Sequence, residues 1–183
     1  MISTPISRLH VFLLVATMVP AAPLAQTFPN VAKDAASLES EKAALLEVIE
    51  RQSAAFWAKD FQRWADTWVH ANYVRRVGWS QPAGASNIEG WDAIGAAMRK
   101  NMLDNPKPNL TPAKLSRTHF NFRIYGHVAW VTFQQRGVDT GEPRFDMPGL
   151  SYETRMFEKH DGKWKIVYLG YVLEENRETP SGR

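Results

Sequence analysis

Apolar residues recur at intervals of three and four from residue 37 onward, with Glu and Lys between them. That spacing predicts a long amphipathic helix, N-capped by Ser37 or Ser40, and a second, shorter helix directly after it. The stripe of the first helix consists of Leu38, Leu45, Ile49, Gln52 and Phe56. The second helix places Phe61, Trp64, Ala65 and Trp68 at the same spacing.

A strand, a loop and a third helix follow. Residues 73–79 have the apolar, β-branched character of a strand, and 80–87 are rich in small and polar residues, which predicts a loop. Helical spacing returns at 89–103, and a proline-rich segment at 105–112 ends that helix.

The rest of the chain alternates between apolar and polar residues, as strands do. We expect tight turns at Gly126-His127 and Asp161-Gly162. The four predicted strands are residues 116–125, 128–135, 151–159 and 163–173. Helices on one side of an antiparallel sheet make an α+β domain, and a sheet that curls around a long helix leaves a pocket at its open end.

Residues 1–25 have the order of a secretory signal peptide. Arg8 precedes a short apolar run at 11–19, and cleavage fits after Ala21 or after Ala25. The run is too short to span a bilayer, and a buried N-terminal helix is the alternative interpretation. We therefore expect an exported protein, periplasmic or secreted.

Length and composition fit one globular domain, since the chain has 183 residues, 44% hydrophobic and 22% charged. After the signal peptide we expect a flexible lead-in at 26–36, a domain at 37–175 and a C-terminal tail at 176–183. The long connection at 137–150 is a candidate lid or oligomer contact.

Several classes of partner and chemistry are excluded by what the sequence lacks. Without cysteine, disulfides, thiol catalysis and zinc–thiolate sites are ruled out. The formal charge of +3 comes with no run of Lys or Arg, so we expect no nucleic-acid partner and, after signal cleavage, no membrane partner. We also expect no metal and no cofactor, because the domain's histidines, at positions 70, 119, 127 and 160, are scattered and no phosphate loop is present.

Three stretches resemble the nuclear transport factor 2-like superfamily, which includes SnoaL-like cyclases, ketosteroid isomerases and the association domain of calmodulin-dependent kinases. AKDFQRWADTW resembles the corner between two helices, with Lys59 where glycine is usual. IEGWDAI resembles the entry to the third helix, and ETRMFEKHDGKWKIVYLGY resembles the closing hairpin of the association domain. The resemblance covers roughly residues 40–173.

The resemblance implies a cone-shaped, cystatin-like fold in which a curved antiparallel sheet wraps around a long N-terminal helix, with two further helices. It also implies that steroid isomerisation by the family's mechanism is excluded. Arg76 stands where that branch has its aspartate base, and Gln52 stands near the position of its oxyanion-hole tyrosine. The association-domain branch holds a small carboxylate with arginines, one of which Arg155 matches, while Tyr171 occupies the position of another.

The predicted pairing of the strands gives the sheet a polar face that we expect to line the pocket: His119, Asn121, Arg123, Trp130, Thr132, Glu153, Arg155 and Tyr171. Arg155 would bind a carboxylate or phosphate, with Asn121 and Tyr171 orienting the ligand. Alternatively, Arg155 pairs with Glu153, or Arg123 pairs with Glu153 across the sheet. The opposite face carries Phe120, Phe122, Ile124, Val131, Phe133, Met156, Ile166 and Tyr168, and its exposure would favour a homodimer formed through the sheets.

Two further groups of residues carry candidate chemistry. Asp66 and His70 would lie one helical turn apart, so that the carboxylate orients a general base, and His119 is a second candidate base. A surface pair is the alternative. Trp57, with the other tryptophans of the helices, would form either an aromatic wall around a ligand or ordinary core packing.

Three functions follow from these patterns. The first is an exported small-molecule-binding protein whose ligand is carboxylated or aromatic. The second is a cofactor-free acid–base enzyme, such as an isomerase, cyclase, dehydratase or hydrolase. The third is a structural homodimer with a filled cavity. An accessible base in the pocket would favour the enzyme, and arginine without such a base would favour binding.

Overall fold

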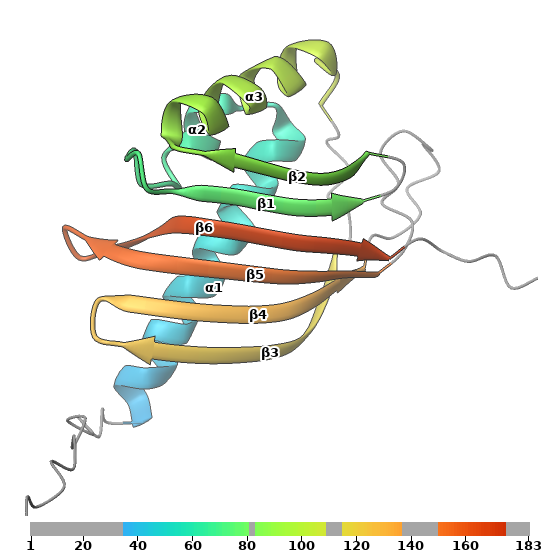
Figure 1. Cartoon of the computed structure of the whole chain (residues 1–183). Helices are drawn as coiled ribbons and strands as arrows, with labels where there is room; N and C mark the ends of the chain where they lie inside the picture. The colour runs from blue at the N-terminus through green and yellow to red at the C-terminus, as the bar shows by residue number, and fades with distance from the viewer. Residues whose placement is uncertain (1–34, 81–82, 109–114, 137–149, 175–183) are drawn as a thin grey trace, which may run out of the picture. The chain divides into compact units, whose positions relative to one another are not determined.

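The computed structural model describes residues 35–80, 83–108, 115–136 and 150–174 (Figure 1). The signal peptide, nearly all of the lead-in, the tail and the candidate lid at 137–149 lie outside the described residues. Within those residues, three helices and a six-stranded sheet form a mixed α+β fold, which confirms the predicted fold class.

The long helix α1 (Ala35–Ala58) begins slightly earlier than the predicted N-caps. Its stripe buries Leu45, Ile49 and Gln52 against the sheet. A polar contact on the flank of α1 also connects it to the sheet. The Glu41 carboxylate accepts a hydrogen bond from the ammonium group of Lys159 in the sheet at 2.6 Å.

A tight corner joins α1 to α2 (Phe61–Ala65). Lys59 adopts a left-handed conformation with a φ of 60°, and the Asp60 N–H bonds back to the Ala55 carbonyl at 3.0 Å, which closes α1. The Asp60 carboxylate then accepts from the Arg63 N–H at 3.0 Å and caps α2. The corner therefore has a lysine in the left-handed position that glycine favours.

The sheet has the strand order β2-β1-β6-β5-β4-β3. Its strands are β1 (Arg75–Ser80), β2 (Gly84–Glu89), β3 (Ser116–Tyr125), β4 (Val128–Arg136), β5 (Leu150–His160) and β6 (Lys163–Glu174). Neighbours pair antiparallel except β1 and β6, which are parallel. An entirely antiparallel sheet was predicted. The parallel pair departs from that prediction, since β1 lies beside β6, the last strand of the chain, and runs in the same direction.

Strand β2 corrects the predicted loop at 80–87. It pairs with β1 as a hairpin, and its residues alternate between half-buried and exposed. The alternation is carried by small and polar side chains in GASNIE, so a pattern based on hydrophobicity does not reveal it. Helix α3 (Trp91–Asp104) follows directly.

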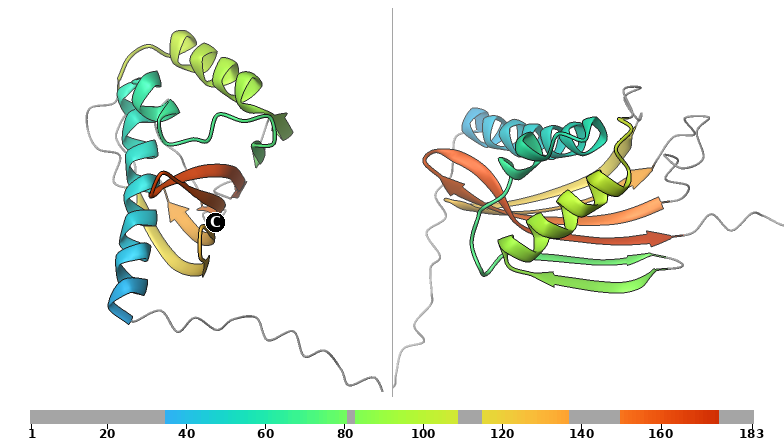
Figure 2. Two further views of the ribbon diagram at one scale, coloured as in Figure 1. Left: turned by 90° about the vertical axis from the view of Figure 1, so that its left-hand side faces the viewer. Right: turned by 90° about the horizontal axis from the view of Figure 1, so that it is seen from above.

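Helix α1 lies across one face of the curved sheet, as Figures 1 and 2 show. That covered face, called here the inner face, carries most of the core. Its buried members include Val131, Phe133, Phe157, Ile166 and Leu169. We call the opposite face the outer face.

The pairing of β4 with β5 corrects the predicted faces. Arg155 lies opposite Val131 and Glu153 lies opposite Phe133, so both charged residues belong to the inner face. Trp130 lies opposite Met156 on the outer face. The prediction was off by one residue in this pairing, and because side chains alternate, a slip of one residue moves a whole strand's side chains to the other face.

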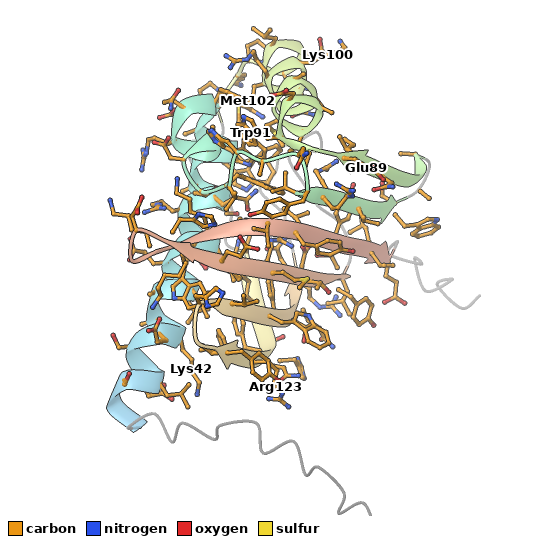
Figure 3. The ribbon with its side chains drawn as sticks, turned by 60° about the vertical axis from the view of Figure 1, so that its left-hand side comes forward. Lys42, Glu89, Trp91, Lys100, Met102 and Arg123 are labelled. Atoms are coloured by element: carbon orange, nitrogen blue, oxygen red, sulfur yellow. The ribbon has the colours of Figure 1, made fainter. Side chains whose placement is uncertain are left out.

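The outer face therefore holds Asn121, Arg123 and Trp130, together with Met156 and Tyr168. Figure 3 shows Arg123 at the edge strand β3. The face that was expected to be exposed, with Phe120, Phe122 and Ile124, packs against the core instead. The exposed large apolar side chains of the outer face are Trp79, Tyr125, Trp130, Tyr152, Met156 and Val172.

Candidate functional site

A cavity of about 310 Å³ lies between α1 and the inner face of the sheet. Its walls are partly apolar, with Ile49 and Phe56 from α1, Trp64 from α2, and Leu169 from β6. The polar side chains that line it are Gln52, Ser53, Arg76, Ser80, Arg117, Gln135, Glu153, Arg155 and Tyr171. Three guanidinium groups in one partly open cavity are unusual, because a buried charge needs a partner.

Arg117 is fully engaged by its neighbours. Its side chain is 6% exposed and forms an ion pair with Glu50. It also donates to the Gln135 side-chain oxygen at 2.8 Å and to the Ser53 hydroxyl at 2.9 Å. A guanidinium with these three partners has most of its donors occupied.

Arg155 forms a buried ion pair with Glu153. Arg155 Nη1 donates to Glu153 Oε2 at 2.8 Å, and both side chains are almost inaccessible. The second carboxylate oxygen of Glu153 accepts from the Ser151 hydroxyl at 2.8 Å. The structure thus has the ion pair that was the alternative to a free, ligand-binding Arg155.

The surroundings of Arg155 show how positive the cavity is. Burial lowers the pKa of Arg155, the charge and hydrogen bond of Glu153 raise it, and the positive charges of Arg117 and Arg76 lower it. Three cations therefore act on one another across the cavity, and Glu153 balances one of them.

Arg76 has a weaker set of partners. Its Nη2 donates to the Tyr171 hydroxyl at 3.4 Å, and its guanidinium lies 5.3 Å from the centre of the Tyr171 ring. Tyr171 is paired with Gly78 on β1, where a Cβ atom would lie 2.2 Å from the ring. Among the described residues, no carboxylate pairs with Arg76.

Gln52 is a buried polar residue on the helix side of the cavity. Its side-chain amide makes no hydrogen bond to any residue that the structure describes. Its amide atoms are not among the fully buried atoms that lack a partner, so they keep some accessibility, and an accessible amide that lines a cavity is a candidate ligand contact.

Asp66 and His70 do not form the predicted pair. Helix α2 ends at Ala65, so the two residues do not share a helical turn. Asp66 instead accepts from the Gln62 side chain at 3.1 Å, and His70 Nε2 is 3.0 Å from the Ala65 carbonyl oxygen. The His70 ring stacks on Trp91, with 3.8 Å between ring centres.

His119 and the other predicted residues divide between the two faces. His119 is exposed, with a φ of 56°, at a bulge in β3. Of the predicted ligand-binding residues, Arg155, Tyr171 and Trp57 line the cavity. Asn121, Arg123 and Trp130 belong to the outer face, for the reason of register given above.

The predicted list of site residues lacked Arg76, Gln52 and Arg117. The resemblance to the ketosteroid isomerase branch could have indicated two of them, because Arg76 stands at the position of that branch's aspartate base and Gln52 stands near the position of its tyrosine. For Arg117 the sequence pattern is misleading, because strict alternation along the strand would put Arg117 on the face opposite to Phe120 and Phe122. The bulge after Thr118 shifts the register and brings Arg117 to the inner face, opposite Gln135.

Two further observations concern metal binding and membrane-spanning helices. Among the described residues, no three side chains of His, Asp or Glu gather closely enough to hold a metal ion. In the same part of the chain, no helix combines the length and apolar character needed to span a bilayer.

The family model described as the SnoaL-like domain matches residues 45–171. The chain belongs to the SnoaL-like domain family. The match includes every residue that lines the cavity except Leu173. No curated protein matches this SnoaL-like chain significantly.

Solved structures share the fold of this SnoaL-like domain at low identity. An NTF-2 like protein of unknown function from Shewanella oneidensis is 17% identical with a TM-score of 0.55, over 72% of this chain and 98% of that one. A cystatin-like protein of unknown function from Nostoc punctiforme is 13% identical with a TM-score of 0.57, over 75% and 93%. A candidate calcium/calmodulin-dependent protein kinase type II association domain from Thiobacillus denitrificans is 12% identical with a TM-score of 0.54, over 70% and 93%. These likenesses confirm the nuclear transport factor 2-like fold.

Proposed function

We propose that this SnoaL-like protein binds a small organic anion, such as a carboxylate with an apolar or aromatic body, in the cavity between α1 and the sheet. The observation that carries the proposal is the set of charges lining the cavity. Arg76, Arg117 and Arg155 line it, and because Arg117 pairs with Glu50 and Arg155 pairs with Glu153, one positive charge has no carboxylate partner among the described residues. A positive cavity attracts anions, and guanidinium groups bind carboxylates through charge-assisted hydrogen bonds.

The size and walls of the cavity narrow the class of ligand. At about 310 Å³, the cavity is at the lower end of the range of ligand pockets, which is about 300–1,000 Å³. Phe56 and Trp57 present aromatic rings to it. A small anion with a flat apolar body would bury that body against these rings while its charge meets the guanidinium groups.

The geometry favours binding over acid–base catalysis. No histidine is among the described residues that line the cavity, and both carboxylate oxygens of Glu153 already accept hydrogen bonds. The candidate bases Asp66, His70 and His119 lie outside it. An enzyme of the proposed acid–base type would need a base within hydrogen-bonding reach of its substrate.

Export and dimerisation are parts of the same proposal. Export rests on the signal-peptide pattern of residues 1–25. A homodimer through the sheet is supported by the outer face, where six large apolar side chains of the described residues are exposed: Trp79, Tyr125, Trp130, Tyr152, Met156 and Val172. A second copy would remove these side chains from water.

Isothermal titration calorimetry tests the proposed function. Benzoate, phenylacetate and indole-3-acetate are titrated into the protein, each beside its neutral amide. We expect saturable binding of at least one acid with one site per chain, no binding of its amide, and weaker binding at high salt. Equal binding of acid and amide, or no binding of any acid, would contradict the proposal.

A further inference from the structure

The three guanidinium groups of the cavity differ in whether their charge is already balanced. Arg117 pairs with Glu50 and Arg155 pairs with Glu153. Among the described residues, Arg76 has no carboxylate partner. Three cations and two carboxylates leave one positive charge, and it belongs to Arg76.

Accessibility also separates Arg76 from Arg155, since Arg155 is buried whereas Arg76 and Arg117, taken as whole residues, are half-buried. The side chains of Arg117 and Arg155 are 6% and 7% exposed. The Nε of Arg155 is fully buried and has no acceptor, so a ligand cannot reach it without displacing protein atoms. Arg76 is only half-buried. It can meet a ligand in the cavity without breaking an existing ion pair.

Tyr171 and Gln52 add donors to the same site. Since Arg76 donates to the Tyr171 oxygen, the hydroxyl proton of Tyr171 is free to be donated elsewhere. The Gln52 amide, which makes no hydrogen bond among the described residues, approaches the cavity from α1. A carboxylate has two oxygens and accepts from several donors at once, so it suits this set.

We propose that Arg76 is the residue that binds the ligand's negative charge, with Tyr171 and Gln52 as further donors, and that the site selects monoanions. This inference rests on the proposed function, since it names the anchor and the charge of the ligand. The paired Arg155 and Arg117 shape the wall and contribute positive potential. A second carboxylate on the ligand would find no further unpaired cation among the described residues that line the cavity.

Two neighbouring arginines provide a matched test. Arg75 and Arg76 are consecutive on β1 and therefore point to opposite faces, and Arg75 pairs with Glu89 at 3.4 Å. In calorimetry with phenylacetate, Arg76→Gln should weaken binding about ten- to a hundredfold, as the loss of a charged hydrogen bond does. Arg75→Gln should stay within about twofold of the unmodified protein. Circular dichroism and thermal melting check that both variants are folded.

A second measurement needs no variant. The unmodified protein should bind phenylacetate at least about tenfold more tightly than the dianion 1,4-phenylenediacetate, because burying an unpaired charge is unfavourable. Equal or tighter binding of the dianion would overturn the monoanion site. Binding retained in Arg76→Gln but lost in Arg155→Met would also overturn it and leave the proposed function standing. If the unmodified protein binds none of the acids, the proposed function itself fails.

Discussion

Gly78 is the residue that gives the Tyr171 ring room to lie across β1. An alanine there would place its Cβ 2.2 Å from the ring, so the ring or the strand must move. We expect Gly78→Ala to lower the free energy of unfolding by about 1–3 kcal/mol, as overpacking does, and to weaken phenylacetate binding. Urea denaturation and calorimetry measure the two effects.

The double variant Gly78→Ala/Tyr171→Ala is the control for this clash. It should lose less stability than the two single variants together, because without the ring the added methyl group has space. Strict additivity, or an unshifted Tyr171 ring in a crystal structure of Gly78→Ala, would contradict the steric explanation.

Tyr73 and Glu158 make a surface contact with a predictable pH dependence. The Tyr73 hydroxyl donates to Glu158 at 2.6 Å. That hydrogen bond, with burial and the carboxylate charge, raises the pKa of Tyr73 to about 12. Because the folded pKa lies above the ordinary value of about 10, the stabilisation is complete below pH ~10 and is lost as the pH rises to about 12.

Ultraviolet absorbance of tyrosinate tests this contact. In the unmodified protein the Tyr73 step should lie near the raised pKa, and Glu158→Ala should return it toward that of a free tyrosine. Tyr73→Phe removes the step and identifies it. An unchanged titration in Glu158→Ala would show that Glu158 does not perturb the pKa of Tyr73.

At the scale of elements, the corner between α1 and α2 depends on Asp60. Its carboxylate caps α2 through the Arg63 N–H. Asp60→Ala should lower the free energy of unfolding by about 1 kcal/mol, whereas Asp60→Asn keeps an acceptor and should cost only a few tenths. Chemical denaturation compares the two variants. If asparagine costs as much as alanine, the cap is not what stabilises the corner.

Most elements follow from hydrophobic periodicity, but their pairing does not. The strand predicted for residues 116–125 has those bounds in the structure, and the helices are displaced only slightly. Strand β2 escapes prediction because small polar residues carry it. The slip between β4 and β5 has a different cause, since sequence separation does not fix which residue of one strand faces which of the other.

The one-residue error in the predicted pairing of β4 with β5 explains which site residues could be predicted from the sequence and which could not. Arg155, Glu153 and Tyr171 lie on the same face, as predicted, but only because a bulge between Met156 and Phe157 shifts the register; the register set at the Asp161-Gly162 turn alone would put Tyr171 on the opposite face. Asn121, Arg123 and Trp130 were assigned to the wrong face. Whether an arginine is already paired depends on side chains from other elements, so the difference between Arg76 and Arg155 required three-dimensional contacts.

At the scale of the whole molecule, the outer face predicts self-association. On that face, Trp130 of β4 is 50% exposed and lies next to Met156 on the neighbouring strand. Analytical ultracentrifugation should show a dimer that Trp130→Lys shifts toward monomer, because a buried unpaired charge is costly. Leu103→Lys, at an exposed site on α3, is the control and should stay dimeric. A monomeric unmodified protein would contradict the interface.

Native mass spectrometry of the purified protein most directly tests the central claim, that the cavity holds a small organic anion. Spectra are recorded gently, then under denaturing conditions, and again after incubation with phenylacetate. We predict a small adduct, one per chain, that denaturation releases and that Arg76→Gln abolishes while Arg75→Gln retains it. A protein that stays bare with every monocarboxylate offered would contradict the claim.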